Sequence, residues 1–208
     1  GYMYTSGEAH GTGTSSTIKT NADKFYTDKL ASYASKLDTN AGFCGDRSNL
    51  NQQSGVGTGT VITYNKGYIR VVESAPTLTC ENASDYYTLA SASSGNKKLN
   101  YPIGLIAADE AMFAGHAGGV FDGMYNHMKS NNGSYLITGN WFWTMTPAGG
   151  YNPFYETGWR APVFYIYGNG VIDDAYISSV GGLRPVINLK SNVTITGSGT
   201  MTDPYDVA

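Results

Sequence analysis

Two cysteines are the residues of this chain with the most reactive side chains. Cys44 and Cys80 are too few for a Cys-x-x-Cys zinc site, so they form a disulfide, remain free thiols or include a nucleophile. In Cys44-Gly-Asp-Arg47 a thiol lies beside two charges that could activate it, but no histidine is near in sequence. We predict a Cys44–Cys80 disulfide, because low charge and abundant Asn, Ser, Thr and Gly suit an extracytoplasmic protein. Asp46 and Arg47 are then expected to brace a loop.

The histidines and one acidic pair offer little support for a metal or acid–base site. His116 and His127 lack a ligand spacing such as His-x-x-x-His, and His10 lies in a Gly-rich stretch, so we interpret all three as exposed to solvent. Asp109 and Glu110 are adjacent, and adjacent helical residues point in different directions. They are better explained as acids in the first turn of a helix.

A calcium site is the remaining metal hypothesis. Asp173 and Asp174, together with Asp203 or Asp206, could gather the ion, but their spacing matches no EF-hand loop. We therefore predict no metal, no cofactor and no catalytic residue.

Aromatic, amide and acidic side chains are concentrated between Ala148 and Ser179. Recognition surfaces combine Tyr with Asn, Ser and Gly, and use Arg at positions that dominate the binding energy. For Phe154 and Trp159, inward packing is an equally good interpretation. The predicted ligand-binding residues are Tyr151, Asn152, Tyr155, Trp159, Arg160, Tyr165, Tyr167, Asn169, Val171, Asp173, Asp174 and Tyr176.

Residues 163–177 are predicted to form the hairpin that positions many of these side chains. Asn169-Gly170 is a dipeptide that tolerates the positive φ angles of a tight hairpin turn. Alternation assigns Phe164, Ile166 and Ile172 to an inner face, and Tyr165, Tyr167, Val171 and Asp173 to an outer face. The outer side chains could then change without disturbing the core.

The remaining elements indicate an α+β fold with an N-terminal helix and a loop-rich, β-rich C-terminal half. After a flexible lead-in over residues 1–16, residues 17–208 are expected to form a single domain. Ser16 or Thr17 would cap a helix that ends at Leu37. A second, shorter helix is expected over 107–114, and strands over 61–64, 68–72, 101–106, 141–146, 183–189 and 193–196.

The composition argues against two classes of partner. Charged residues make up 14% of the chain, its net charge is −3 and it has no basic run, which argues against nucleic acid as a ligand. No apolar run reaches the length of a membrane span. The N-terminus lacks the features of a signal peptide, and the chain does not begin with Met, so a membrane anchor would belong to a segment absent from this chain.

Several motifs, in order, resemble the framework of a family of surface proteins from gut Firmicutes and related bacteria, which often carry a pilin-like N-terminal membrane helix. The resemblance extends from Thr17 to the C-terminus. The motifs are Gly42-Phe-Cys-Gly-Asp-Arg-Ser48, Tyr101-Pro-Ile-Gly-Leu-Ile-Ala-Ala-Asp-Glu-Ala111, Trp143-Thr-Met-Thr-Pro147 and Gly182-Leu-Arg-Pro-Val-Ile-Asn-Leu-Lys190.

The resemblance implies a C-type lectin-like fold, which is also used by the formylglycine-generating enzyme and by variable proteins of diversity-generating retroelements. It implies that residues 148–181 are the hypervariable display segment. Neither the Glu-Pro-Asn nor the Trp-Asn-Asp signature of calcium-dependent lectins is present, and the catalytic cysteines of the formylglycine enzyme are missing from the C-terminal half. Calcium-dependent sugar binding and oxidase chemistry are therefore not implied.

We expect a non-enzymatic, extracellular or cell-surface protein for ligand binding and adhesion. Its ligand would be a protein or a glycan on the bacterial surface or in phage–host interaction. The strand with Trp141 and Trp143 would be scaffold, and Arg184 would be held by a carboxylate or by loop carbonyls. The alternatives are an enzyme that uses Cys44 or the Asp173/Asp174 pair, and a structural pilus or cell-wall subunit.

Overall fold

A helical segment opens the described part of the chain. The structure is a computed structural model, and it describes residues 15–50, 64–118, 136–137, 139–149, 162–200 and 202–207. The segment comprises α1 (Thr17–Phe25), a π-helical turn (Tyr26–Leu30) and a 3-10 helix (Ala31–Lys36). The Ser16 hydroxyl accepts a hydrogen bond from the Lys19 amide at 3.3 Å, which confirms the predicted helix and its cap.

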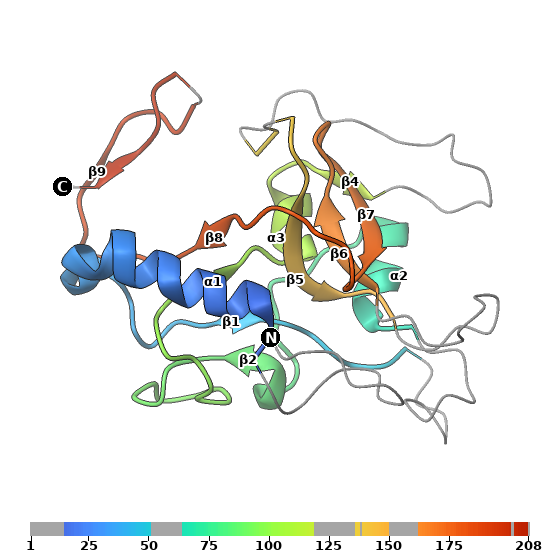
Figure 1. Ribbon diagram of the computed structural model, residues 1–208, viewed down its shortest axis with the longest axis horizontal. Helices are drawn as coiled ribbons and strands as arrows, with labels where there is room; N and C mark the ends of the chain where they lie inside the picture. Colours follow the sequence, from blue (N-terminus) through green and yellow to red (C-terminus); the bar gives the residue numbers. More distant parts are fainter. Residues whose placement is uncertain are drawn as a thin grey trace.

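The helical segment packs against the C-terminal end of the chain. Ala22, Tyr26 and Leu37 are buried with Ile103 in one apolar cluster. Leu37 also forms an isolated β-bridge with Leu189. Residues near the two ends of the described chain are therefore joined through this cluster, and Figure 1 shows α1 and β8 in the same half of the molecule.

The strands of the predicted hairpin belong to a four-stranded sheet. Its order is β4 (Ala117–Gly118), β7 (Val171–Tyr176), β6 (Pro162–Ile166) and β5 (Phe142–Pro147). β4 runs parallel to β7, whereas β7, β6 and β5 form an antiparallel meander. The predicted hairpin is confirmed, with Gly170 at φ 90° in its turn.

Two helices cover one face of this sheet, and Figure 1 shows both beside it. They are α2 (Lys66–Glu73) and α3 (Ala108–Phe113). Val71 of α2 and Ala111 of α3 are buried in a single core cluster with residues of β5, β6 and β7. The strand residues of this cluster are Phe142, Phe164, Ile166 and Ile172, so the predicted inner face of the hairpin is confirmed.

The predicted strand over 68–72 is wrong, because these residues form α2. Ile69, Val71 and Val72 are β-branched, which favours a strand by propensity, but short apolar runs do not distinguish strand from helix. As a helix, the segment turns Tyr68 and Val71 toward the core, three residues apart on one face. Gly67 permits the close approach, since a Cβ there would lie 2.6 Å from Thr146 Cγ2.

The remaining strands are short. β1 (Phe43–Cys44) pairs with β2 (Tyr86–Tyr87), β3 (Gly104–Leu105) with β8 (Pro185–Val186), and β9 (Ile195–Thr196) with β10 (Asp206–Val207). A short 3-10 helix (Ala83–Asp85) precedes β2. The predicted strands over 101–106 and 183–189 thus shrink to two residues each, because Pro102 and Pro185 lack the amide that a longer ladder requires.

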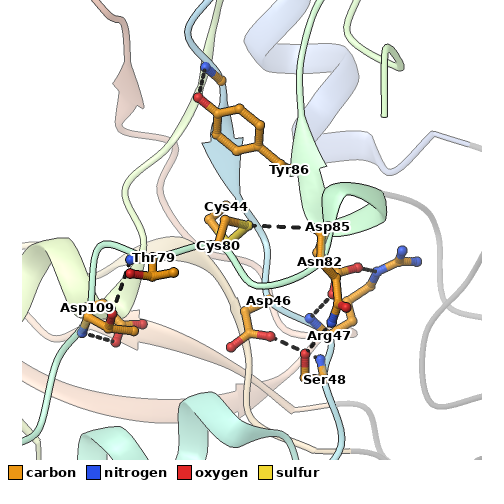
Figure 2. Close-up of a disulfide and its surroundings, with 12 residues drawn as sticks. Cys44, Asp46, Arg47, Ser48, Thr79, Cys80, Asn82, Asp85, Tyr86 and Asp109 are labelled. Carbon is orange, nitrogen blue, oxygen red and sulfur yellow. Dashed lines mark hydrogen bonds and ion pairs between the residues drawn. A yellow bond between two sulfur atoms is a disulfide. The ribbon is translucent and has the colours of Figure 1, made fainter. Parts of the chain in front are cut away.

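The predicted disulfide between Cys44 and Cys80 is confirmed. Their Cα atoms are 5.7 Å apart, and the bond closes a loop across a sequence separation of 36 residues. Figure 2 shows it beside the Arg47–Asp85 ion pair and the hydrogen bond from Asn82 to Ser48, which fasten the same loop. The bond is typical of an oxidising, extracytoplasmic environment. No helix in the described ranges is long and apolar enough to cross a membrane.

Candidate ligand-binding face

The outer side of the meander carries a cluster of aromatic residues. Trp143 of β5 pairs with Tyr165 of β6, which pairs in turn with Asp173 of β7, so these side chains project from the same face in three adjacent strands. Trp141 and Tyr167 share the alternation of Trp143 and Tyr165. We call these residues, Trp141, Trp143, Tyr165, Tyr167 and Asp173, the aromatic face.

The rings of the aromatic face touch one another at large angles. Trp141 lies 5.0 Å from Trp143 and 4.9 Å from Tyr165, with interplanar angles of 74° and 63°. Tyr165 and Tyr167 are 6.1 Å apart at 56°. Trp143 is only 8% exposed, whereas Tyr167 is 48% exposed. The aromatic face is therefore buried at Trp143 of β5 and exposed to solvent near the hairpin turn.

A carboxylate lies within the aromatic face. The Tyr165 hydroxyl donates to Asp173 Oδ2 at 3.2 Å, and the Asp174 amide donates to Asp173 Oδ1 at 2.8 Å. Burial, together with the charge of Asp173, raises the pKa of the Tyr165 hydroxyl above its ordinary value. The phenol therefore stays protonated and orients the carboxylate.

Asp174 and Tyr176 do not belong to this face. The register pairs Asp174 with Phe164 and Tyr176 with Pro162, which places both on the side of the sheet that α2 and α3 cover. Burial, and then the charge of Asp173, raises the pKa of Asp174 from 3.8 to about 6. Burial is also the main reason why the pKa of Tyr68 is raised, and the charge of Asp174 adds to it.

The prediction that Val171 lies on an exposed face is wrong. Val171 is 0% exposed, and it pairs with Ala117 of β4 on one side while its carbonyl accepts from the Tyr167 amide on the other. Alternation assigns a side chain to a face, but it does not say whether that face is covered at that position. Val171 is therefore part of the packing beneath the hairpin turn and cannot contact a ligand.

The hairpin turn is held by its own polar contacts. The Asn169 side-chain oxygen accepts from the Val171 amide at 3.1 Å, so Asn169 stabilises the turn while remaining exposed. The prediction of a solvent-exposed His116 is wrong, since it is 3% exposed and its Nδ1 lies 2.6 Å from the Gly170 carbonyl oxygen. A buried carbonyl requires such a partner. His116 therefore positions the turn that carries Tyr167.

Several predicted residues lie outside the described ranges. They are the ligand-binding candidates Tyr151, Asn152, Tyr155, Trp159 and Arg160, together with Phe154, His10 and His127. The predicted lead-in is described only at Ser15 and Ser16.

The charged residues that suggested other chemistry serve the fold. Arg70 bridges Asp109, at 2.6 Å from Nε, and Asp46, at 2.7 Å from Nη1. Burial opposes ionisation of Asp46, but hydrogen bonds from Ser48 and Arg70 outweigh it and lower the pKa of the carboxyl. The Glu110 carboxylate accepts from the Ala107 amide at 2.7 Å, which confirms its role at a helix start.

Two further expectations for charged residues can be compared with the structure. The prediction for Arg184 is confirmed, because its Nη1 donates to the Leu136 carbonyl oxygen at 2.7 Å and its guanidinium lies over the Phe142 ring. Asp203 and Asp206 lie in or beside the C-terminal hairpin, and Figure 1 shows β9 and β7 at opposite ends of the molecule. Within the described ranges, no group of His, Cys, Asp and Glu side chains could hold a metal ion.

Trp141 and Trp143 are the members of the face that sequence reasoning missed. The hypothesis assigned them to the scaffold, but their rings form the inner part of the aromatic face. The signal was present in the sequence, since Trp-x-Trp and Tyr165-x-Tyr167 have the same two-residue period.

Comparison with protein-family models, with curated proteins and with solved structures found no match.

Proposed function

We propose that this chain is a non-enzymatic ligand-binding protein of the cell surface, with a C-type lectin-like fold, that binds a protein or glycan through the aromatic face. The observation that supports it best is the partition of the hairpin. The inner side chains of the hairpin are buried in the core with residues of α2 and α3, while Tyr167 is 48% exposed on the opposite face. Large rings with polar tips are effective contact residues.

The resemblance to variable retroelement proteins is compatible with this geometry. Its display segment, residues 148–181, contains β6 and β7. Outward side chains there can be exchanged without disturbing the cluster around Phe164 and Ile166. The disulfide supports a location outside the cytoplasm.

The enzyme alternative loses its main candidates. Cys44 is bonded to Cys80, and a disulfide sulfur cannot act as a thiolate nucleophile. Asp173 and Asp174 point to opposite sides of β7, so they do not converge on one reacting atom. The structural-subunit alternative predicts self-association through the aromatic face, which sedimentation of the wild type and of Tyr167→Ala would reveal.

A pair of tyrosine variants tests the proposal. Binding to glycan arrays and to bacterial and host proteins is measured for the wild type, for Tyr167→Ala and for Tyr33→Ala. Tyr33 is 50% exposed on the helical segment and serves as the matched control. We expect Tyr167→Ala to weaken binding roughly tenfold or more, as for a residue central to an interface, while Tyr33→Ala does not. Equal affinities of the two variants at unchanged Tm would contradict the proposal.

A further inference from the structure

Within the described ranges, the carboxylate of Asp173 has no cationic partner. Its hydrogen bonds within the described ranges come from the Tyr165 hydroxyl and the Asp174 amide, and neither donor carries a positive charge. The most buried aspartates elsewhere are each paired with an arginine. These are Asp46, Asp85 and Asp109. Asp173 thus differs from these three aspartates, because its negative charge is not neutralised by an arginine.

Two positively charged residues that follow β7 in the sequence bind other groups. Arg184 donates to the Leu136 carbonyl oxygen, and Lys190 donates to the Ser35 carbonyl oxygen at 2.6 Å. Among the described residues from 136 to 207, Arg184 is the single arginine and Lys190 the single lysine. Neither of these two side chains therefore neutralises Asp173.

The ring geometry also favours a cation. Trp141, Trp143 and Tyr165 meet at interplanar angles of 63° to 79°, so they offer no shared flat platform for stacking a sugar ring. Tyr167 is 48% exposed and lies 6.1 Å from Tyr165, the residue whose hydroxyl holds Asp173. This arrangement suits a positive group, which is attracted to ring faces within about 6 Å.

We propose that the aromatic face binds a positively charged side chain, Lys or Arg, of a protein ligand, with Asp173 as its counter-ion and Trp141, Tyr165 and Tyr167 as ring contacts. This inference rests on the proposed function, which it narrows to a basic protein ligand. The Tyr165 hydroxyl holds Asp173 in place, so the carboxylate is already oriented when the cation arrives. The rings shield the ion pair from water, which strengthens the attraction.

The test uses an amino-acid probe and a neutral probe of nearly the same shape. N-acetyl-arginine amide and N-acetyl-citrulline amide are titrated into protein labelled with ¹⁵N at tryptophan, and the indole N–H signals of Trp141 and Trp143 are followed. We expect saturable shifts with the arginine probe. The affinity for the citrulline probe should be lower by a factor of roughly ten or more, since charge-assisted hydrogen bonds are lost. Added salt should weaken the arginine probe alone.

Substitution of the carboxylate gives a second readout. Asp173→Asn keeps the shape and one of the two acceptor oxygens but removes the charge. It should weaken binding of the arginine probe roughly tenfold. Asp206→Asn, on exposed β10, is the matched control and should leave the titration unchanged. If Asp173→Asn does not fold, the comparison of the arginine and citrulline probes on the wild type still tests whether the aromatic face binds a positive charge.

The outcomes separate this inference from the proposed function. Methyl glycosides that shift the indole signals more strongly than the arginine probe would overturn the cation inference and leave the binding face standing. Arginine and citrulline probes of equal affinity, or no shift with either, would also overturn it. Failure of the proposed function itself would appear separately, as array binding that survives Tyr167→Ala.

Discussion

Neighbouring residues of β7 have opposite environments. Asp173 faces the rings of the outer side, whereas Asp174 lies opposite Phe164 on the side covered by the helices. The acidic dipeptide looked like one feature in the sequence, but strand alternation divides it between the aromatic face and the side packed against the helices. At the residue scale, the proposed binding role of a carboxylate therefore depends on the side of the strand from which it projects.

Asp174 should make stability fall as pH rises. Its pKa is raised from 3.8 to about 6 in the folded state, so the folded protein binds the proton more tightly than the unfolded chain. Protonated Asp174 contributes about 3 kcal/mol to the free energy of unfolding. This contribution is complete below about pH 4 and is lost as pH rises through about 6. Asp174→Asn should remove this loss and be more stable than the wild type at pH 7.

Urea unfolding of both proteins across this pH range checks the prediction. The difference in free energy of unfolding between variant and wild type isolates Asp174 from groups such as Asp46, whose lowered pKa acts in the opposite direction. A difference that does not change with pH would show that Asp174 is not the titrating group.

Tyr165→Phe should separate packing from orientation of the carboxylate. The ring contacts with Trp141 and Trp143 remain, but the hydrogen bond to Asp173 is lost. We expect a cost of about 1 kcal/mol in the free energy of unfolding, measured by urea denaturation. A much larger loss would mean that the phenol supports the fold through more than this bond.

At the scale of elements, the hairpin was predictable and α2 was not. The Asn169-Gly170 turn and strict alternation define the hairpin locally, and the inner residues Phe164, Ile166 and Ile172 are confirmed. Residues 68–72 have strand propensity, but long-range contacts decide their conformation. In α2, Arg70 reaches Asp46 and Asp109 while Val71 enters the core.

Arg70→Met should be strongly destabilising. The arginine neutralises Asp46 and Asp109, which are largely buried, and its removal leaves both carboxylates without their counter-ion. We expect a loss of about 3 kcal/mol or more in thermal or urea unfolding at neutral pH. Lys24→Met, which breaks the exposed Lys24–Asp28 pair, is the matched control and should leave Tm unchanged. Equal effects of the two variants would refute this role of Arg70.

The disulfide should stabilise the molecule without contributing to recognition. It joins β1 to the loop before β2, whereas the aromatic face lies on β5, β6 and β7. Replacing Cys44 and Cys80 together by alanine should lower the free energy of unfolding by about 4 kcal/mol. Ligand affinity, measured where the variant is still folded, should remain that of the wild type. A weaker affinity would place the disulfide loop in the site.

At the scale of the whole molecule, the α+β class, the early helix and the β-rich second half followed from the sequence. The joining of the chain ends did not, because it depends on two-residue strands and on the Leu37–Leu189 bridge. Such short pairings have no local signature, since tertiary packing selects them. The molecule combines a scaffold held together by these contacts with a hairpin whose outer face is exposed at Tyr167.

The most direct test of the central claim is selection of a random peptide library on the immobilised wild-type protein. The enriched peptides are then measured against Tyr167→Ala and the control Tyr33→Ala. The account predicts that peptides rich in Lys or Arg bind the wild type and Tyr33→Ala, and that they lose their affinity for Tyr167→Ala. Peptides that bind all three proteins equally would contradict a recognition role for the aromatic face.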